Sequence, residues 1–186
     1  MRSLLFLLPI ATAAVPAIAA ETVPVPAFRS VELRGGGDVV VRPGPSQRVT
    51  IVSGSTRFTA FHVTRDGQLR IDACNESCPR HYDLRIEIVS PHAPDLAIRG
   101  GGTIAAAPGF APQPDLSAAV DGGGIIDLRA VAATSFNAAI NGGGKILAGR
   151  SSVLAAAVNG GGEVRYSGNP EVSSAVHGGG NVRPGG

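Results

Sequence analysis

The same pattern recurs in SAAVDGGGIIDL (117–128), NAAINGGGKILA (137–148), AAAVNGGGEVRY (155–166) and SSAVHGGGNVRP (173–184). Each stretch places a β-branched residue two positions before a Gly-Gly-Gly triplet and another two positions after it. The whole chain holds six such triplets, which begin at residues 35, 100, 122, 142, 160 and 178. The last five are 22, 20, 18 and 18 residues apart. This spacing indicates an internal structural repeat.

The glycines are too numerous to be tolerated without a structural reason. Each interior glycine costs roughly 0.5–1 kcal/mol relative to alanine, so the triplets together cost roughly 10–18 kcal/mol, which is comparable with the net stability of a domain. Sharp backbone turns and the close approach of neighbouring backbones would justify that cost. We therefore expect a structural corner at the middle glycine of each repeat: Gly101, Gly123, Gly143, Gly161 and Gly179.

Apolar residues occupy alternate positions before the triplets. Position minus two holds Ile98, Val120, Ile140, Val158 and Val176, and position minus six holds Leu116, Phe136, Leu154 and Val172. A period of two predicts a strand with one apolar face, and the β-branched residue after each triplet predicts a second strand. Such units bury their apolar faces only when they stack, about 4.8 Å apart.

The fold class that follows is all-β. We predict a right-handed parallel β-helix, or β-solenoid, for the glycine-corner repeats of residues 95–184. An antiparallel sandwich with glycine-rich hairpins remains the alternative, because 18 residues also suffice for two strands and two turns.

Residues 28–94 show a different pattern, in which short alternating strands are joined by turn signals. DVVVRPGPSQRVTIV (38–52) predicts a hairpin closed by Pro-Gly-Pro-Ser, which pairs Val39 and Val41 with Val49 and Ile51. FHVTRDGQLRID (61–72) predicts a second hairpin closed by Asp66-Gly67. We expect this half to consist of short antiparallel hairpin strands with one buried face.

The first 20 residues, MRSLLFLLPIATAAVPAIAA, combine Arg2, an apolar stretch and small residues at the end. This composition predicts a signal peptide that is removed, followed by a short linker over residues 21–27. No later stretch supplies about 18 uninterrupted apolar residues, so no transmembrane segment is expected. We expect an exported protein that is periplasmic, with an outer-membrane-associated or extracellular location as the alternatives.

Charge and composition argue against several functions. Without Arg2 the chain has 15 basic and 14 acidic residues, and Lys145 is its only lysine, so no nucleic-acid partner is expected. The chain has no Trp and two Tyr, its carboxylates and histidines are dispersed, and no G-x-S-x-G motif occurs. We expect a non-catalytic protein without a cofactor. A polysaccharide-active β-helix enzyme is the alternative.

The two cysteines lie in the polar loop DACNESCPRHYD (72–83). An exported protein favours a disulfide between Cys74 and Cys78, which would fasten the loop locally. The alternative is a metal site made by both cysteines with His81 and His62.

One polar residue precedes each of the last four triplets: Asp121, Asn141, Asn159 and His177. If the units stack, these outward-facing residues align as a polar ladder, which we treat as a candidate interaction site. A row of this kind could also bind a cation. Alternatively, Asn and Asp serve the tight turn locally.

Taken in order, these features resemble the putative autotransporter adhesin head domain family, also called the GIN domain. The resemblance rests on FRSVELRGGGDVVVRPG (28–44), on HVTRDGQLRI (62–71), on the recurring glycine units and on VRYSGNPEV (164–172). It implies a β-helix-like envelope domain without a recognised catalytic site, in a family largely of unknown function.

We therefore expect an adhesin-like or scaffold protein that offers a rigid surface for interaction. The expected partner is an unidentified envelope protein or surface component. A homo-oligomer joined through the open strand edge of the last unit is a further expectation, because open edges recruit other strands.

Overall fold

The computed structural model describes residues 20–74 and 78–185. The predicted signal peptide therefore lies, except for its last residue, outside the described residues. Every regular element within them is a strand, and the strands are β1 Glu21–Val23, β2 Ser30–Gly35, β3 Asp38–Pro43, β4 Arg48–Ser53, β5 Thr59–Val63, β6 Gln68–Ala73, β7 Arg85–Ser90, β8 Asp95–Gly100, β9 Thr103–Ala106, β10 Gln113–Gly122, β11 Ile125–Leu128, β12 Ala133–Gly142, β13 Lys145–Gly160, β14 Glu163–Ser167, β15 Glu171–His177 and β16 Asn181–Pro184.

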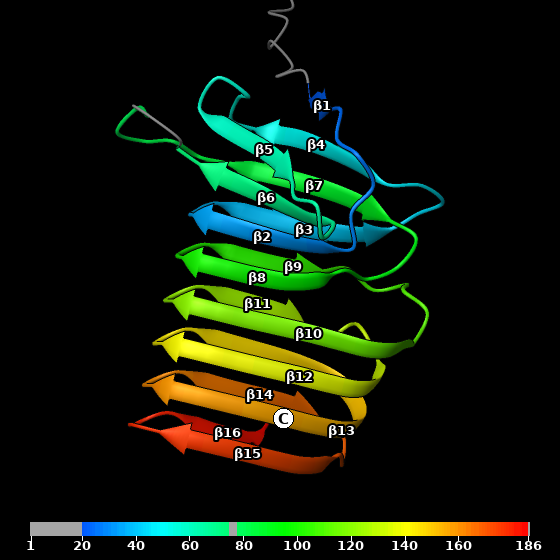
Figure 1. The fold of residues 1–186 in the computed structure, drawn as a ribbon, viewed down its shortest axis with the longest axis vertical. Helices are drawn as coiled ribbons and strands as arrows, with labels where there is room; N and C mark the ends of the chain where they lie inside the picture. Colours follow the sequence, from blue (N-terminus) through cyan, green and yellow to red (C-terminus); the bar gives the residue numbers. More distant parts are fainter. Residues whose placement is uncertain (1–19, 75–77, 186) are drawn as a thin grey trace, which may run out of the picture.

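The strands form one 16-stranded sheet that folds back on itself around a shared core (Figure 1). The front ladder consists of β5-β6-β2-β8-β10-β12-β13-β15 and the back ladder of β1-β4-β7-β3-β9-β11-β13-β14-β16. The long strand β13 belongs to both, since its first residues pair in the back ladder and its last residues in the front one.

From β8 onward, neighbouring strands pair in parallel and in register with the repeat. Val120 lies beside Ile140, Ile140 beside Val158, and Val158 beside Val176. Each glycine triplet carries the chain from the front ladder to the back one, and the triplets hydrogen-bond to each other, as in Gly143 N to Gly122 O at 3.0 Å. The predicted inward positions form the core, with Leu116, Phe136 and Leu154 fully buried.

The all-β prediction is confirmed, but the finer prediction of a right-handed parallel β-helix is not, because the sheet as a whole is mixed. Strand β1 pairs antiparallel with β4, β4 with β7, and β5 with β6. Strand β1 also lies within the stretch that was expected to be a linker.

Of the two predicted hairpins, one is confirmed and the other is wrong. Strands β5 and β6 pair as expected, with Phe61 opposite Ile71. Strands β3 and β4 do not pair, because β7 lies between them, parallel to β3 and antiparallel to β4. This insertion places the buried Ile86 and Ile88 of β7 in register with Val39 and Val41, so β7 is paired along both edges.

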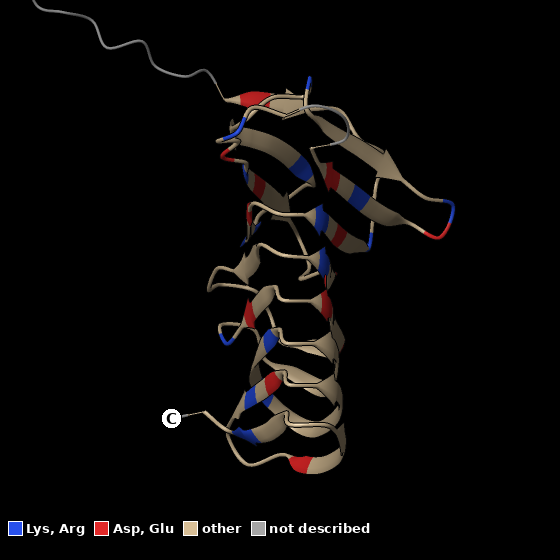
Figure 2. Ribbon diagram, turned by 90° about the vertical axis from the view of Figure 1, so that its left-hand side faces the viewer, with Lys and Arg blue, Asp and Glu red and all other residues tan. Residues whose placement is uncertain are grey.

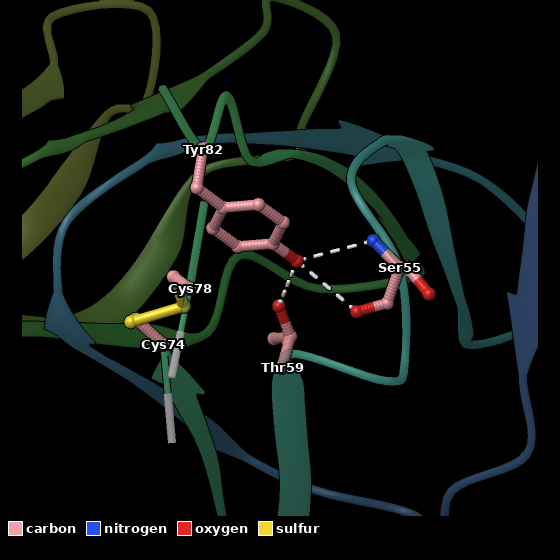
Figure 3. The surroundings of a disulfide bond; sticks show 5 residues. All are labelled: Ser55, Thr59, Cys74, Cys78 and Tyr82. Atoms are coloured by element: carbon pink, nitrogen blue, oxygen red, sulfur yellow. Dashed lines mark hydrogen bonds between the residues drawn. A yellow bond between two sulfur atoms is a disulfide. The ribbon is translucent and has the colours of Figure 1, made fainter. Parts of the chain in front are cut away.

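A tyrosine fastens the loops at the N-terminal end of the stack. The Tyr82 hydroxyl donates to the Ser55 carbonyl oxygen at 3.0 Å, accepts from the Ser55 N–H at 3.1 Å, and lies 2.6 Å from the Thr59 hydroxyl (Figure 3). The Tyr82 ring also packs edge-on against Phe58. These contacts close this end of the core.

Candidate functional site

The register brings the four predicted ladder residues together. Asp121 lies beside Asn141, Asn141 beside Asn159, and Asn159 beside His177 on the outward face of the front ladder. All four side chains are exposed. The Asn159 Nδ2 donates to the Asn141 Oδ1 at 3.2 Å, so the two amides keep free donors and acceptors for a partner.

The same row continues toward the N-terminus with basic residues. Arg99 pairs in register with Asp121, and Arg34 with Arg99. Both contact the carboxylate of Glu32, which is only 2% exposed: Arg99 Nε is 2.6 Å from Oε1 and Arg34 Nε is 3.2 Å from Oε2. Arg70 Nε also lies 3.2 Å from Oε2. The next residue of the row is Asp72, whose Oδ1 lies 3.8 Å from Arg34 Nη1. Three guanidinium groups and two carboxylates leave this end of the row with a small positive charge.

A groove that the sequence analysis missed runs alongside the ladder. Its outward-facing floor is a row of alanines, each three positions before a triplet: Ala97, Ala119, Ala139, Ala157 and Ala175. One side of the groove is formed by a second row, which lies two residues earlier along the same strands: Asp95, Ser117, Asn137, Ala155 and Ser173. We call this feature the alanine groove.

The alanine groove has a volume of about 530 Å³, and its lining extends in the stacking direction from Gln68 of β6 and Ser30 of β2 to Ser173 of β15, whereas the alanine floor crosses the last five strands of the front ladder, β8 to β15. It is shallow because its side chains are short, whereas alanines on the inward face of the same strands, such as Ala118 and Ala138, are buried. The signal was present in the sequence, since alanine recurs at position minus three in all five repeats.

Charge is distributed unevenly between the two faces. In the last units the front ladder carries few charged residues, whereas the back ladder carries both signs (Figure 2). Within the groove, partial burial raises the pKa of Asp95, although the Ser117 N–H donates to its carboxylate at 2.8 Å. The groove lining is otherwise uncharged. It therefore suits a partner that offers hydrogen bonds and small apolar contacts.

The back ladder holds a cluster of ions around Glu163. Arg165 Nε lies 2.9 Å, Lys145 Nζ 3.0 Å and Arg183 Nε 2.7 Å from its carboxylate oxygens. Hydrogen bonds from Arg165, Arg183 and Lys145 lower the pKa of Glu163 to about 2. Because these residues come from β13, β14 and β16, the cluster links three neighbouring strands.

Cys74 and Cys78 form the predicted disulfide, with their Cα atoms 5.5 Å apart (Figure 3). Both sulfurs are thereby unavailable as thiolate ligands for the alternative metal site with His62 and His81. In the described part of the chain, no three His, Cys, Asp or Glu side chains gather closely enough to hold a metal ion.

The steric constraint at the corners falls on the outer glycines of each triplet rather than on the predicted middle one. A Cβ on Gly123, Gly143, Gly161 or Gly179 would meet nothing within 4 Å, and on Gly101 only the Gly35 oxygen at 3.7 Å. By contrast, Gly142 has a φ of +121° and its Cβ would lie 2.6 Å from the Gly122 oxygen. A Cβ on Gly144 would collide with Val120 Cγ1.

Part of the chain matches a known protein family. Residues 113–170, from the start of β10 to the loop before β15, match the family described as "Putative auto-transporter adhesin, head GIN domain". The predicted resemblance to the GIN family is confirmed over this segment. A comparison with functionally described proteins finds no significant match.

One solved structure shares the fold of this chain, and two others align with it less well. A putative adhesin from Bacteroides fragilis aligns with a TM-score of 0.56 at 16% identity, covering 89% of this chain and 96% of its own. A putative adhesin from Parabacteroides merdae aligns at 0.42 and 14% identity over 90% of this chain and 96% of its own. A putative cell adhesion protein from Clostridium sporogenes aligns with a TM-score of 0.42 at 10% identity, covering 89% of this chain and 97% of its own.

Within residues 20–74 and 78–185 of this chain, no helix is long and apolar enough to cross a membrane.

Proposed function

We propose that this chain is an exported, non-catalytic protein of the cell envelope that binds a partner, in an adhesin-like or scaffold role, through the alanine groove and the polar ladder beside it. One observation carries the proposal: five alanines and a parallel row of polar side chains are held in register across neighbouring strands. The names of the GIN family and of the fold relatives, which concern adhesion, point in the same direction.

The proposed scaffold is a right-handed β-solenoid over residues 95–184. Parallel pairing of every unit with the next supports this description of the C-terminal half, and right-handed connections are the rule for parallel strands. Such a stack is rigid because each unit is hydrogen-bonded to both of its neighbours. A rigid face loses little conformational entropy when it binds.

The shape of the groove indicates the form of the partner. Five strands about 4.8 Å apart give an alanine floor roughly 19 Å long, which fits an extended segment lying along the stacking direction. The exposed amides of Asn141 and Asn159 lie on the same face and can hydrogen-bond to that segment. The proposed partner is a protein or surface component of the envelope, which this protein would encounter in the periplasm.

The groove is better suited to binding than to glycoside hydrolysis. Glycosidases generally use two carboxyl groups on either side of the scissile bond. Asp95 is the single carboxylate among the residues that line the groove. The residues that line the groove include no histidine or cysteine that could act as base or nucleophile.

Photo-crosslinking in cells tests the proposal. A photoreactive residue at Ala139, in the groove floor, should give a defined crosslinked product, whereas one at Ile125 of the back ladder, which is 39% exposed, should not. The substitution Asn137→Arg, which places a long charged side chain over the groove, should abolish the Ala139 product. Equal products from Ala139 and Ile125, or a product that is insensitive to Asn137→Arg, would contradict the proposal.

A further inference from the structure

Strands β15 and β16 form the C-terminal end of the stack (Figure 1), and the hydrophobic core is open there. Val172 and Val176 of β15 are 39% and 40% exposed, although they occupy the same inward positions as Leu154 and Val158, which are fully buried. Strand β15 pairs with β13 along one edge, and no strand of the described residues pairs with its other edge. This end therefore presents apolar side chains and unpaired backbone groups together.

The core is covered at the opposite end of the stack, which we call the closed end, although β1 and β5 each leave one edge unpaired among the described strands. There the outermost loops and strands cover the core, so that Phe28 is 6% and Val49 0% exposed, and the Tyr82 hydroxyl ties two loops together. The closed end therefore offers another copy no exposed core to pack against. The complementary surface for the open end is a second open end.

The sequence of β15, EVSSAVH (171–177), is nearly symmetric about Ser174. Val172 and Val176 lie two residues on either side of the centre, and Glu171 and His177 three residues on either side. In an antiparallel pair, directly opposite residues point to the same face of the sheet. Pairing β15 with itself about Ser174 would place each Val172 against Val176 of the second copy, facing the core, and each Glu171 against His177, facing outward.

We propose that two copies of this chain join tail to tail through β15, in antiparallel register centred on Ser174, with one two-fold axis between them. Cross-strand valine pairs and pairs of a carboxylate with an imidazole favour this register. The interface is self-complementary, as two-fold interfaces are. In β16, Pro184 lacks an N–H group that could donate to a neighbouring strand, so β15 supplies the specific pairing.

This inference develops the homo-oligomer expected from the sequence, and it does not depend on the envelope partner of the proposed function. A monomeric protein would refute the tail-to-tail pairing and leave the crosslinks from Ala139 unaffected. Failure of those crosslinks would leave the dimer unaffected.

Light scattering of the purified protein over a range of concentrations tests the association. We expect a dimer that Val176→Lys weakens by at least about tenfold, because it places an unpaired charge at the centre of an interface. Val52→Lys is the matched control, since Val52 is a 46% exposed valine on β4 at the closed end, and it should leave the dimer intact. A protein that stays monomeric, or a dimer that both variants weaken equally, would overturn the proposal.

Two further variants test the register. Ser174→Cys should give a disulfide-linked dimer on mild oxidation, whereas Ser152→Cys, an exposed position on β13, should not. Glu171→His and His177→Glu should each weaken the dimer, and the double variant, which restores an opposite pair in the same register, should recover it. A dimer that forms without the Ser174→Cys crosslink, or a double variant as weak as the singles, would refute the Ser174-centred register.

Discussion

Alanine at Gly142 should destabilise the protein strongly, whereas alanine at the adjacent Gly143 should not. Gly142 has a φ of +121°, and a residue with a Cβ in that region is strained by about 1–3 kcal/mol. The added Cβ would also lie 2.6 Å from the Gly122 oxygen, and forcing this contact apart costs about 1–3 kcal/mol. Loss of unfolded-state entropy offsets about 0.4–1 kcal/mol. The net effect is a loss of roughly 2–5 kcal/mol.

Thermal unfolding followed by circular dichroism measures this difference. For a chain of this size, a loss of that magnitude lowers Tm by roughly 5–20 °C. Gly143→Ala should leave Tm unchanged or raise it by a few degrees, because a Cβ at Gly143 meets nothing within 4 Å and its φ lies outside the left-handed region. If the two variants melt at the same temperature, or if Gly143→Ala melts lower, the steric account of the corners is wrong.

Three other predictions concern single contacts. The Glu163 carboxyl should titrate with a pKa of about 2 by NMR. Because this folded pKa lies below the ordinary value of 4.5, the contribution of Glu163 to stability is complete above about pH 4.5 and is lost as the pH falls toward 2. Glu163→Gln should remove that pH dependence. Tyr82→Phe should cost about 1–3 kcal/mol in urea unfolding, because it leaves the buried Thr59 hydroxyl without its partner; no change would show that this contact is dispensable. Replacing Cys74 and Cys78 by serine should cost at most about 2 kcal/mol, since the closed ring is short, and global unfolding at room temperature would contradict that estimate.

Much of the stacking could be predicted from the sequence, because it is local and repeated. The alternation of Leu116, Ala118 and Val120 before a triplet specifies which residues face the core, and the constant offset to the next triplet specifies their neighbours. The alignment of Asn141 with Asn159 follows from the same offset.

The remaining features depend on contacts between distant segments. The predicted pairing of β3 with β4 rested on their proximity in sequence, and it is wrong because β7 lies between them. The burial of Glu32 could not be predicted either, since its three arginines come from β2, β6 and β8. The alanine row that forms the groove floor is visible in the sequence, but alanine is so common in this chain that the row does not stand out from the other alanines.

The in-register stacking has a consequence for how proteins of this kind vary. Each unit from β10 onward contacts mainly the unit before it and the unit after it, so duplication or deletion of one 18-residue segment would lengthen or shorten the molecule without disturbing its other layers. The reach of the proposed binding face could thus change in steps of one strand spacing during evolution, while its chemistry stayed constant.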